Sequence, residues 1–539
     1  GAKLQEALRD ERSTVIALSA LAQAQGVEPT DPRAVKRVAA FAAAGSMGKA
    51  AQLARSLGVN PLTKDVLDEL QAKHPHPDAR ELAATALSDL PDRAEVWSAK
   101  RWLQALAATG GQQREGVHPM EAALMYVEQK ALRTDVRAGF VEAHVAVKLG
   151  MGRHLLRDVL LILTGAIPEE AAQVLRTARL IPLRKPDGKS RPIGIGGWLR
   201  RFASSIAVDV VQADTVKWLQ QRGQLGVRTP GGAEVVIHTI RAAWDRRTRA
   251  AQLFDTRETF RKGAPGPVPG EPDAPAVAYP APRPRKRGRD HSHEEDCMAQ
   301  DSITAEPDGG RPKEDFVCIR IDFQNAFNRV PRSLARRLLC QHAAHCVPLF
   351  DRLYGVVGNP DDDPVLTVGG TALTIEARTG CTQGCGLSPL LCALLIAYLT
   401  ERVLARWPDG QPPDMASGIL SYLDDVHIFG SLAFAKAAAH AFAEETKRLA
   451  PGMRLTKVVG FAADMGKDRP KDEDLPRGVD DDKPSTWVPY GQGFAIMNVL
   501  AARHAGNEQQ EDAQLLQNPQ FCDVLRRVAD RDPHAAHLL

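Results

Sequence analysis

Cysteine is scarce in this sequence and is not arranged in pairs. The eight cysteines among 539 residues form no Cys-x-x-Cys motif, which excludes the common zinc-finger spacings and argues against a disulfide framework. We therefore expect reduced thiols in an intracellular protein. The best zinc candidate, His291 and His293 with Cys297, lies in a polar tract and is a poor one.

Long apolar runs and a strong net charge are also missing. No apolar stretch reaches the roughly 18 residues that a membrane span requires, and no secretory signal pattern opens the sequence. The best apolar stretch, residues 387–399, predicts a buried helix. The formal net charge of +3 excludes a chain that is basic throughout.

Positive charge is instead local. Between residues 176 and 201 a single acid, Asp187, accompanies Arg176, Arg179, Arg184, Lys185, Lys189, Arg191, Arg200 and Arg201. This segment fits a surface for nucleic acid and triphosphate, because phosphate contacts dominate such binding. A solvated surface is the alternative.

Length and composition divide the chain. A chain of 539 residues exceeds one core and predicts two or more domains. Residues 1–150 are rich in Ala and Leu with a helical period, so we expect a helical domain that is either a scaffold or an RNA-binding extension. Residues 255–314 contain Gly-Pro repeats, a basic cluster and an acidic tract, which indicates a disordered insertion. The basic cluster fits a nuclear localisation signal, an RNA contact or a solubilising tract.

Two adjacent acids, Asp424 and Asp425, lie between short apolar runs. The pattern predicts two strands joined by a tight turn, with the acids at its tip. Adjacent carboxylates repel, and a buried hairpin seldom places them side by side without a cation. A magnesium pair for phosphoryl or nucleotidyl transfer is one interpretation. An exposed turn is the other, because Asp favours turns.

A third acid, Asp322, ends the apolar run 316–321. A β-branched strand can deliver this carboxylate beside the hairpin, where three acids would repel strongly unless divalent cations neutralised them. Between the acid sites, residues 379–391 form a Gly-rich turn that leads into a helix. We expect Ser388 at the N-cap of this helix and Pro389 at its first position.

In this order the blocks resemble the palm of a reverse transcriptase, most of all the enzymes of non-LTR retrotransposons. Asp322 matches the first-motif aspartate, residues 383–389 match the template-grip motif, and residues 422–425 match the signature hairpin. Residues 180–194 resemble the fingers motif of the same family. Thr382 stands where a proline often precedes the Gln-Gly pair, so the geometry of that loop departs from the family pattern.

The resemblance implies a fold of the α+β class, a right-hand polymerase with fingers and an antiparallel palm sheet after a mainly helical N-terminal domain. The implied parts are a helical N-terminal extension (1–150), fingers (151–254), a disordered insertion (255–314), a palm (315–500) and the start of a thumb or a tail (501–539).

The resemblance also implies the roles of the acids. Asp322, Asp424 and Asp425 would be catalytic and, with the backbone carbonyl of Phe323, would hold two Mg²⁺ ions, for which Mn²⁺ would substitute. The ions would lower the pKa of the primer 3′-hydroxyl and stabilise the leaving pyrophosphate.

Further residues would contact the nucleotide and the nucleic acid. By resemblance, Lys189 and Arg191 reach the triphosphate, and Gln383 contacts the nucleotide. Phe327 matches the aromatic residue that lies under the sugar and excludes a 2′-hydroxyl, although a core aromatic is its ordinary interpretation. The implied template or primer residues are Gly384, Tyr422 and Lys457.

The implied function is an RNA-directed DNA polymerase that copies an RNA template from a DNA primer with dNTPs, in the nucleus and without a membrane partner. An RNA-dependent RNA polymerase shares the palm and its Asp pair, but Phe327 argues against it. A decayed palm that only binds RNA is the non-enzymatic alternative, and the presence of all three acids argues against that one.

Overall fold

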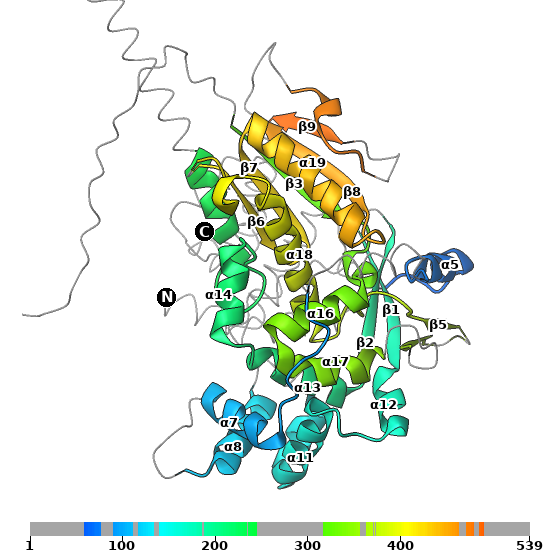
Figure 1. Cartoon of the computed structure of the whole chain (residues 1–539). Helices are drawn as coiled ribbons and strands as arrows, with labels where there is room; N and C mark the ends of the chain where they lie inside the picture. The colour runs from blue at the N-terminus through cyan, green and yellow to red at the C-terminus, as the bar shows by residue number, and fades with distance from the viewer. Residues whose placement is uncertain are drawn as a thin grey trace, which may run out of the picture. The chain divides into compact units, whose positions relative to one another are not determined.

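Two β-sheets with helices around them make up the described part of the chain (Figure 1). The computed structural model describes residues 59–76, 90–110, 117–133, 140–185, 188–233, 235–244, 316–355, 363–369, 371, 373–414, 416–462, 470–478 and 485–489. The expected insertion at 255–314 and the expected tail at 501–539 lie outside these ranges. The structure is a mixture of helices and sheets, which is compatible with the predicted α+β class.

The larger sheet is built around β3 and has the strand order β6-β7-β3-β8-β9. Antiparallel pairing joins β6 to β7, β7 to β3 and β3 to β8, whereas β8 and β9 are parallel. The edge strand β9 thus departs from the antiparallel sheet that we expected. The strands are β3 (Phe316–Phe323), β6 (Gly418–Tyr422), β7 (Asp425–Ser431), β8 (Leu455–Ala462) and β9 (Thr486–Pro489).

The two faces of β3 have different surroundings, because side chains alternate along a strand. Every second residue from Val317 to Phe323 belongs to the main apolar core. On the opposite face, Phe316 and Cys318 belong to a smaller apolar cluster. Arg320 and Asp322 continue this second face and are exposed. The strand therefore presents charge only toward its C-terminal end.

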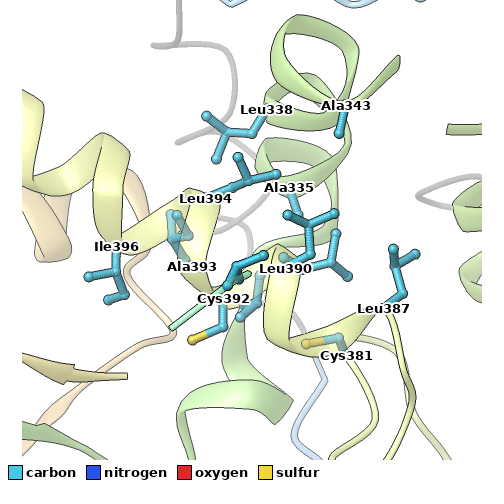
Figure 2. Close-up of a cluster of buried hydrophobic side chains, with 14 of the residues drawn as sticks. Ala335, Leu338, Ala343, Cys381, Leu387, Leu390, Cys392, Ala393, Leu394 and Ile396 are labelled. Atoms are coloured by element: carbon cyan, nitrogen blue, oxygen red, sulfur yellow. The ribbon is translucent and has the colours of Figure 1, made fainter. Parts of the chain in front are cut away.

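Helices α16, α18 and α19 pack together beside the sheet, and α19 contacts β3 and β7. Leu338 of α16 and Leu390 and Leu394 of α18 are completely buried in the cluster that Figure 2 shows. Burying each such side chain stabilises the fold by about 1.5–3 kcal/mol. The helices are α16 (Arg332–His342), α18 (Ser388–Leu404) and α19 (Leu432–Leu449).

Helix α18 confirms the buried helix predicted over residues 387–399 and corrects its start. Leu387 occupies the N-cap position, so the helix begins at Ser388, one residue earlier than expected, and Pro389 is its second residue rather than its first. The Ser388 hydroxyl donates to the Thr382 carbonyl oxygen at 2.9 Å and so closes the preceding loop. The expected N-cap at Ser388 is wrong because this longer-range hydrogen bond uses the hydroxyl.

The smaller sheet has the order β2-β1-β4-β5. Strands β1 and β2 form an antiparallel hairpin whose turn includes a hydrogen bond from Lys185 N to Lys189 O at 2.8 Å. Strand β4 joins β1 in parallel. The strands are β1 (Ala178–Arg184), β2 (Ser190–Gly196), β4 (Val365–Val368) and β5 (Thr374–Glu376).

The described residues before position 150 are mainly helical, as the sequence predicted. Helices α7 and α10 both contact α8, and α11 contacts α8 and α13. Helix α5 instead contacts β2. Further α-helices are α5 (Lys64–Ala72), α7 (Ala99–Thr109), α8 (Pro119–Leu132), α10 (Val141–Lys148), α11 (Gly152–Leu163), α12 (Glu169–Arg176), α13 (Trp198–Asp209), α14 (Ala213–Gln221) and α17 (Val347–Tyr354), and residues 235–244 are also helical. Short 3-10 helices are η2 (Ala326–Arg329), η3 (Ala344–Cys346), η5 (Pro408–Gly410) and η7 (Asp472–Asp474).

Candidate active site at the β6–β7 turn

The turn between β6 and β7 consists of Leu423 and Asp424. Tyr422 pairs with Asp425 across it. Leu423 has a φ angle of 56°, in the left-handed region that branched side chains rarely adopt. The predicted hairpin is confirmed, with Asp424 in the turn and Asp425 at the start of β7.

Strand β3 brings Asp322 to the same end of the sheet. Ile321 lies opposite Val426, so the strand register places Asp322 beside the start of β7. Burial raises the pKa of Asp424 to about 6, and the charges of Asp425 and Asp322 add to this rise. Although Asp322 keeps contact with solvent, partial desolvation by the surrounding protein raises its pKa, and the charge of Asp425 adds to this rise. The neighbouring acids thus act on the pKa of Asp424 and on that of Asp322.

Arg320 neutralises the third acid. Its guanidinium donates to Asp425 Oδ1 at 2.6 Å, and the two side chains are 45% and 43% exposed. Among the described residues, no three His, Cys, Asp or Glu side chains gather closely enough to hold a metal ion. The site therefore has the pair Asp322 and Asp424 with an ion-paired neighbour rather than a closed three-acid cluster. Repulsion between carboxylates and the attraction of Arg320 account for this arrangement.

Asp322 and Asp424 line one cavity of about 590 Å³. The cavity wall includes five other residues that the sequence nominated for metal or nucleotide binding, namely Phe323, Phe327, Gln383, Lys189 and Arg191. These five residues come from three parts of the sequence, namely residues 189–191, residues 323–327 and the Gly-rich loop, and the fold brings these parts together.

The β1–β2 hairpin supplies a basic wall to this cavity. Arg191 opposes the rise in the pKa of Asp424, and Lys185 opposes the rise in the pKa of Asp322. Cationic groups therefore act on the acids across the cavity. Positive charge on one wall and carboxylates on another suit a ligand that carries both phosphate and a metal ion.

The Gly-rich loop lies against β2. Gly194 N donates to Gln383 O at 2.8 Å. Gly384 has a φ angle of 113°, and a Cβ atom there would lie 2.7 Å from Gly194 O, so a side chain does not fit. Gly384 thus allows the loop to approach the backbone of β2 closely, and Gln383 lines the cavity.

Helix α5 contributes residues that our sequence interpretation missed. Glu69 accepts hydrogen bonds from Ser190 N at 3.0 and 3.1 Å, and Lys73 donates to Glu69 and to Ser190 O. Asn60 donates to Ser190 Oγ at 2.8 Å. Glu69 and Lys73 line the cavity. This segment therefore fixes the hairpin that carries Lys189 and Arg191.

The end of α5 also fastens the turn that follows Asp322. Asn325 Nδ2 donates to Lys73 O at 2.5 Å. Burial lowers the pKa of His74, so its ring is neutral. Because Leu70 O, 2.8 Å from Nδ1, can only accept, the ring donates there and accepts from Asn328 Nδ2 at Nε2, 2.7 Å away.

The residues predicted to contact template or primer lie in different places. Gly384 packs on β2, and Tyr422 is 38% exposed on β6. The backbone of Lys457 pairs with Asp322, and its side chain lies outside the described part of the structure.

The sequence matches no protein-family model and no curated protein. Within the described residues, the helices are too short or too polar to cross a membrane. The cavity and the residues that line it are therefore the features of this chain that indicate a function.

Proposed function

We propose that the chain is an RNA-directed DNA polymerase of the reverse transcriptase type, in which the β3 sheet is the palm and the β1–β2 hairpin belongs to the fingers. The observation that carries this proposal is a single cavity lined by Asp322 and Asp424 and also by Lys189 and Arg191. Paired carboxylates beside cationic side chains suit the transfer of a nucleotide from a metal-bound triphosphate.

The acids fit a divalent cation. Burial and neighbouring carboxylates raise the pKa of Asp424, and a cation would relieve that cost. Asp322, Asp424 and the Phe323 carbonyl would hold Mg²⁺, and Asp425 would join them by leaving Arg320. When bound, the metal would lower the pKa of the primer 3′-hydroxyl and stabilise the leaving pyrophosphate.

The basic wall would bind the incoming nucleotide. The forked guanidinium of Arg191 matches two phosphate oxygens, and the Lys189 ammonium supplies a point charge. Phe327 lines the same cavity. A ring under the sugar would leave no room for a 2′-hydroxyl and would select dNTPs. Gln383 would contact the nucleotide through its amide.

Primer extension tests the proposal. The purified protein should extend a DNA primer on an RNA template with dNTPs and Mg²⁺. Asp424→Asn should lower the rate by several orders of magnitude and leave RNA binding intact, because a neutral amide cannot neutralise the cation. Asp158→Asn changes an exposed aspartate on α11 and is the matched control, which should keep the rate. Equal extension by Asp424→Asn would contradict the metal assignment.

Nucleotide choice separates the alternatives. The wild type should use dNTPs and reject NTPs, and Phe327→Ala should admit NTPs. Extension with NTPs at the same rate by the wild type would identify an RNA-dependent RNA polymerase. RNA binding without extension on either substrate would identify an RNA-binding palm.

A further inference from the structure

A residue outside the hairpin bonds to the backbone of its turn. Gln224 follows α14 and is completely buried. Its Oε1 accepts from Leu423 N–H at 2.9 Å, and its Nε2 donates to Leu423 O at 3.0 Å. A primary amide bonded to both the N–H and the C=O of one residue restrains the backbone on both sides of that residue.

The same segment lies along β6. Leu225 N donates to Ser421 O at 2.9 Å, and Ser421 N donates to Gly223 O at 2.8 Å. Gly226 N donates to Gln224 Oε1 at 2.9 Å. A Cβ atom on Gly226 would lie 2.6 Å from Leu423 N, so this position has no room for a side chain. Residues 223–226 therefore form a close-fitting support for the turn.

Leu423 requires such support. Its φ angle of 56° is unfavourable for a leucine and persists where the surroundings determine it. Leu423 directly precedes Asp424, so a rotation of the Leu423 backbone moves the Asp424 carboxylate. The hydrogen bonds of Gln224 thus act on the residue that sets the position of a proposed metal ligand.

We propose that Gln224 is a positioning residue for nucleotidyl transfer, which holds Leu423 in its left-handed conformation and so places the Asp424 carboxylate in the cavity. The kinetic part of this inference rests on the proposed polymerase function. The structural part does not, because the state of the turn can be measured without activity.

Hydrogen exchange at the Leu423 amide tests the structural part. This amide should exchange slowly in the wild type and faster in Gln224→Met, which removes both hydrogen bonds to Leu423, and the one from Gly226 N, and keeps the length of the side chain. Gln220→Met removes the hydrogen bond from Gln220 Nε2 to Thr229 Oγ1 in the same region and should leave the Leu423 amide unchanged. Rapid exchange in the wild type, or equal exchange in the two variants, would overturn the proposal.

Kinetics test the positioning role. In Gln224→Met, kcat should fall about a hundredfold, as expected for a small misplacement of a catalytic group. The KM for dNTP should stay constant, because Lys189 and Arg191 lie on the other wall. A second change, Leu423→Asn, should restore part of the loss, because asparagine tolerates the left-handed region better. A kcat equal to that of Gln220→Met, or a double variant without recovery, would contradict the role.

Gly226→Ala is a second variant that tests the positioning role of the 223–226 segment if Gln224→Met does not fold. The added methyl would press on Leu423 N while Gln224 remains, so kcat should again fall with KM constant. An unchanged kcat would reject the positioning role. If the wild type extends no primer, the polymerase proposal fails and the exchange measurement still decides the structural part. If the wild type and Gln224→Met extend equally, the polymerase proposal stands and the positioning role fails.

Discussion

Helix α18 and the β6–β7 turn belong to the same core region, yet their sequences suit their local structures to very different degrees. From Leu390 to Leu399 every residue of α18 is buried, and the run consists mostly of apolar residues with good or tolerable helix propensity. At the turn, a leucine is left-handed, two acids are adjacent, and the pKa of Asp424 is raised to about 6. Agreement between local preference and tertiary structure stabilises a fold, whereas conflict marks positions where function determines the residue.

The conflict at the turn is resolved by other segments. Gln224 bonds to Leu423, and Arg320 pairs with Asp425. Helix α18 is stabilised by its apolar contacts. The comparison predicts that substitutions in α18 change stability, and that substitutions at the turn change chemistry.

Leu394→Ala should show the largest change in stability. Leu394 is completely buried in the cluster of Figure 2. Its truncation should lower the free energy of unfolding by about 2–5 kcal/mol, measured by denaturant titration. Leu149→Ala, at a side chain that is 70% exposed, should change it by about 0.5 kcal/mol or less. A lower primer-extension rate per folded molecule in Leu394→Ala would contradict the expectation that substitutions in α18 change stability and not chemistry.

Lowering the pH should reduce the extension rate by protonating Asp424 at the turn. In the proposed mechanism the metal needs the Asp424 carboxylate, whose pKa without the metal is about 6. At a Mg²⁺ concentration too low to saturate the site, the extension rate should therefore fall about tenfold for each pH unit below that value, because the ionised fraction available to the metal falls in that proportion. A rate that stays constant from pH 7 down to pH 5, on a protein that remains folded, would contradict the raised pKa.

The contribution of Asp424 to the free energy of unfolding should change with pH in the direction opposite to the extension rate. The pKa of Asp424 rises from its ordinary value of 3.8 to about 6 in the folded state, so the folded state binds this proton more tightly than the unfolded state does. Asp424 should therefore cost stability as pH rises from 3.8 to about 6, and this cost should then stay constant. Denaturation at pH 4 and pH 7 should show Asp424→Asn gaining on the wild type at the higher pH. An identical difference at both values would refute the assignment.

Glu69→Gln should have the smallest effect and extends the comparison to the β1–β2 hairpin. Gln can still accept from Ser190 N, but it loses the ion pair with Lys73, which is partly exposed and is worth about 1 kcal/mol or less. The KM for dNTP should rise a few-fold at constant kcat. Glu473→Gln, at a side chain that is 72% exposed, should leave the KM unchanged. A change in kcat alone would show that α5 does not act through the hairpin.

Patterns between neighbours in sequence predicted much of the larger sheet. The short apolar runs of β6 and β7 and the apolar run of β3 indicated where the three acids would lie. The length and apolar character of residues 387–399 indicated a buried helix. These features depend on interactions within a few residues, so the sequence records them directly.

Contacts between distant segments could not be predicted in the same way. Glu69 and Ser190 are 121 residues apart, and α5 reads as an ordinary amphipathic helix. A leucine carries no preference for the left-handed region, so the support from Gln224 left no local signal. The N-cap at Leu387 and the parallel pairing of β9 likewise depend on tertiary contacts.

The ion pair between Arg320 and Asp425 has a consequence for how the protein is made. Because the guanidinium supplies an internal counter-charge, strands β3 and β7 can associate during synthesis before any divalent ion arrives. If the proposed metal site exists, removing the ion with a chelator should abolish primer extension without unfolding the protein, and adding the ion back should restore primer extension.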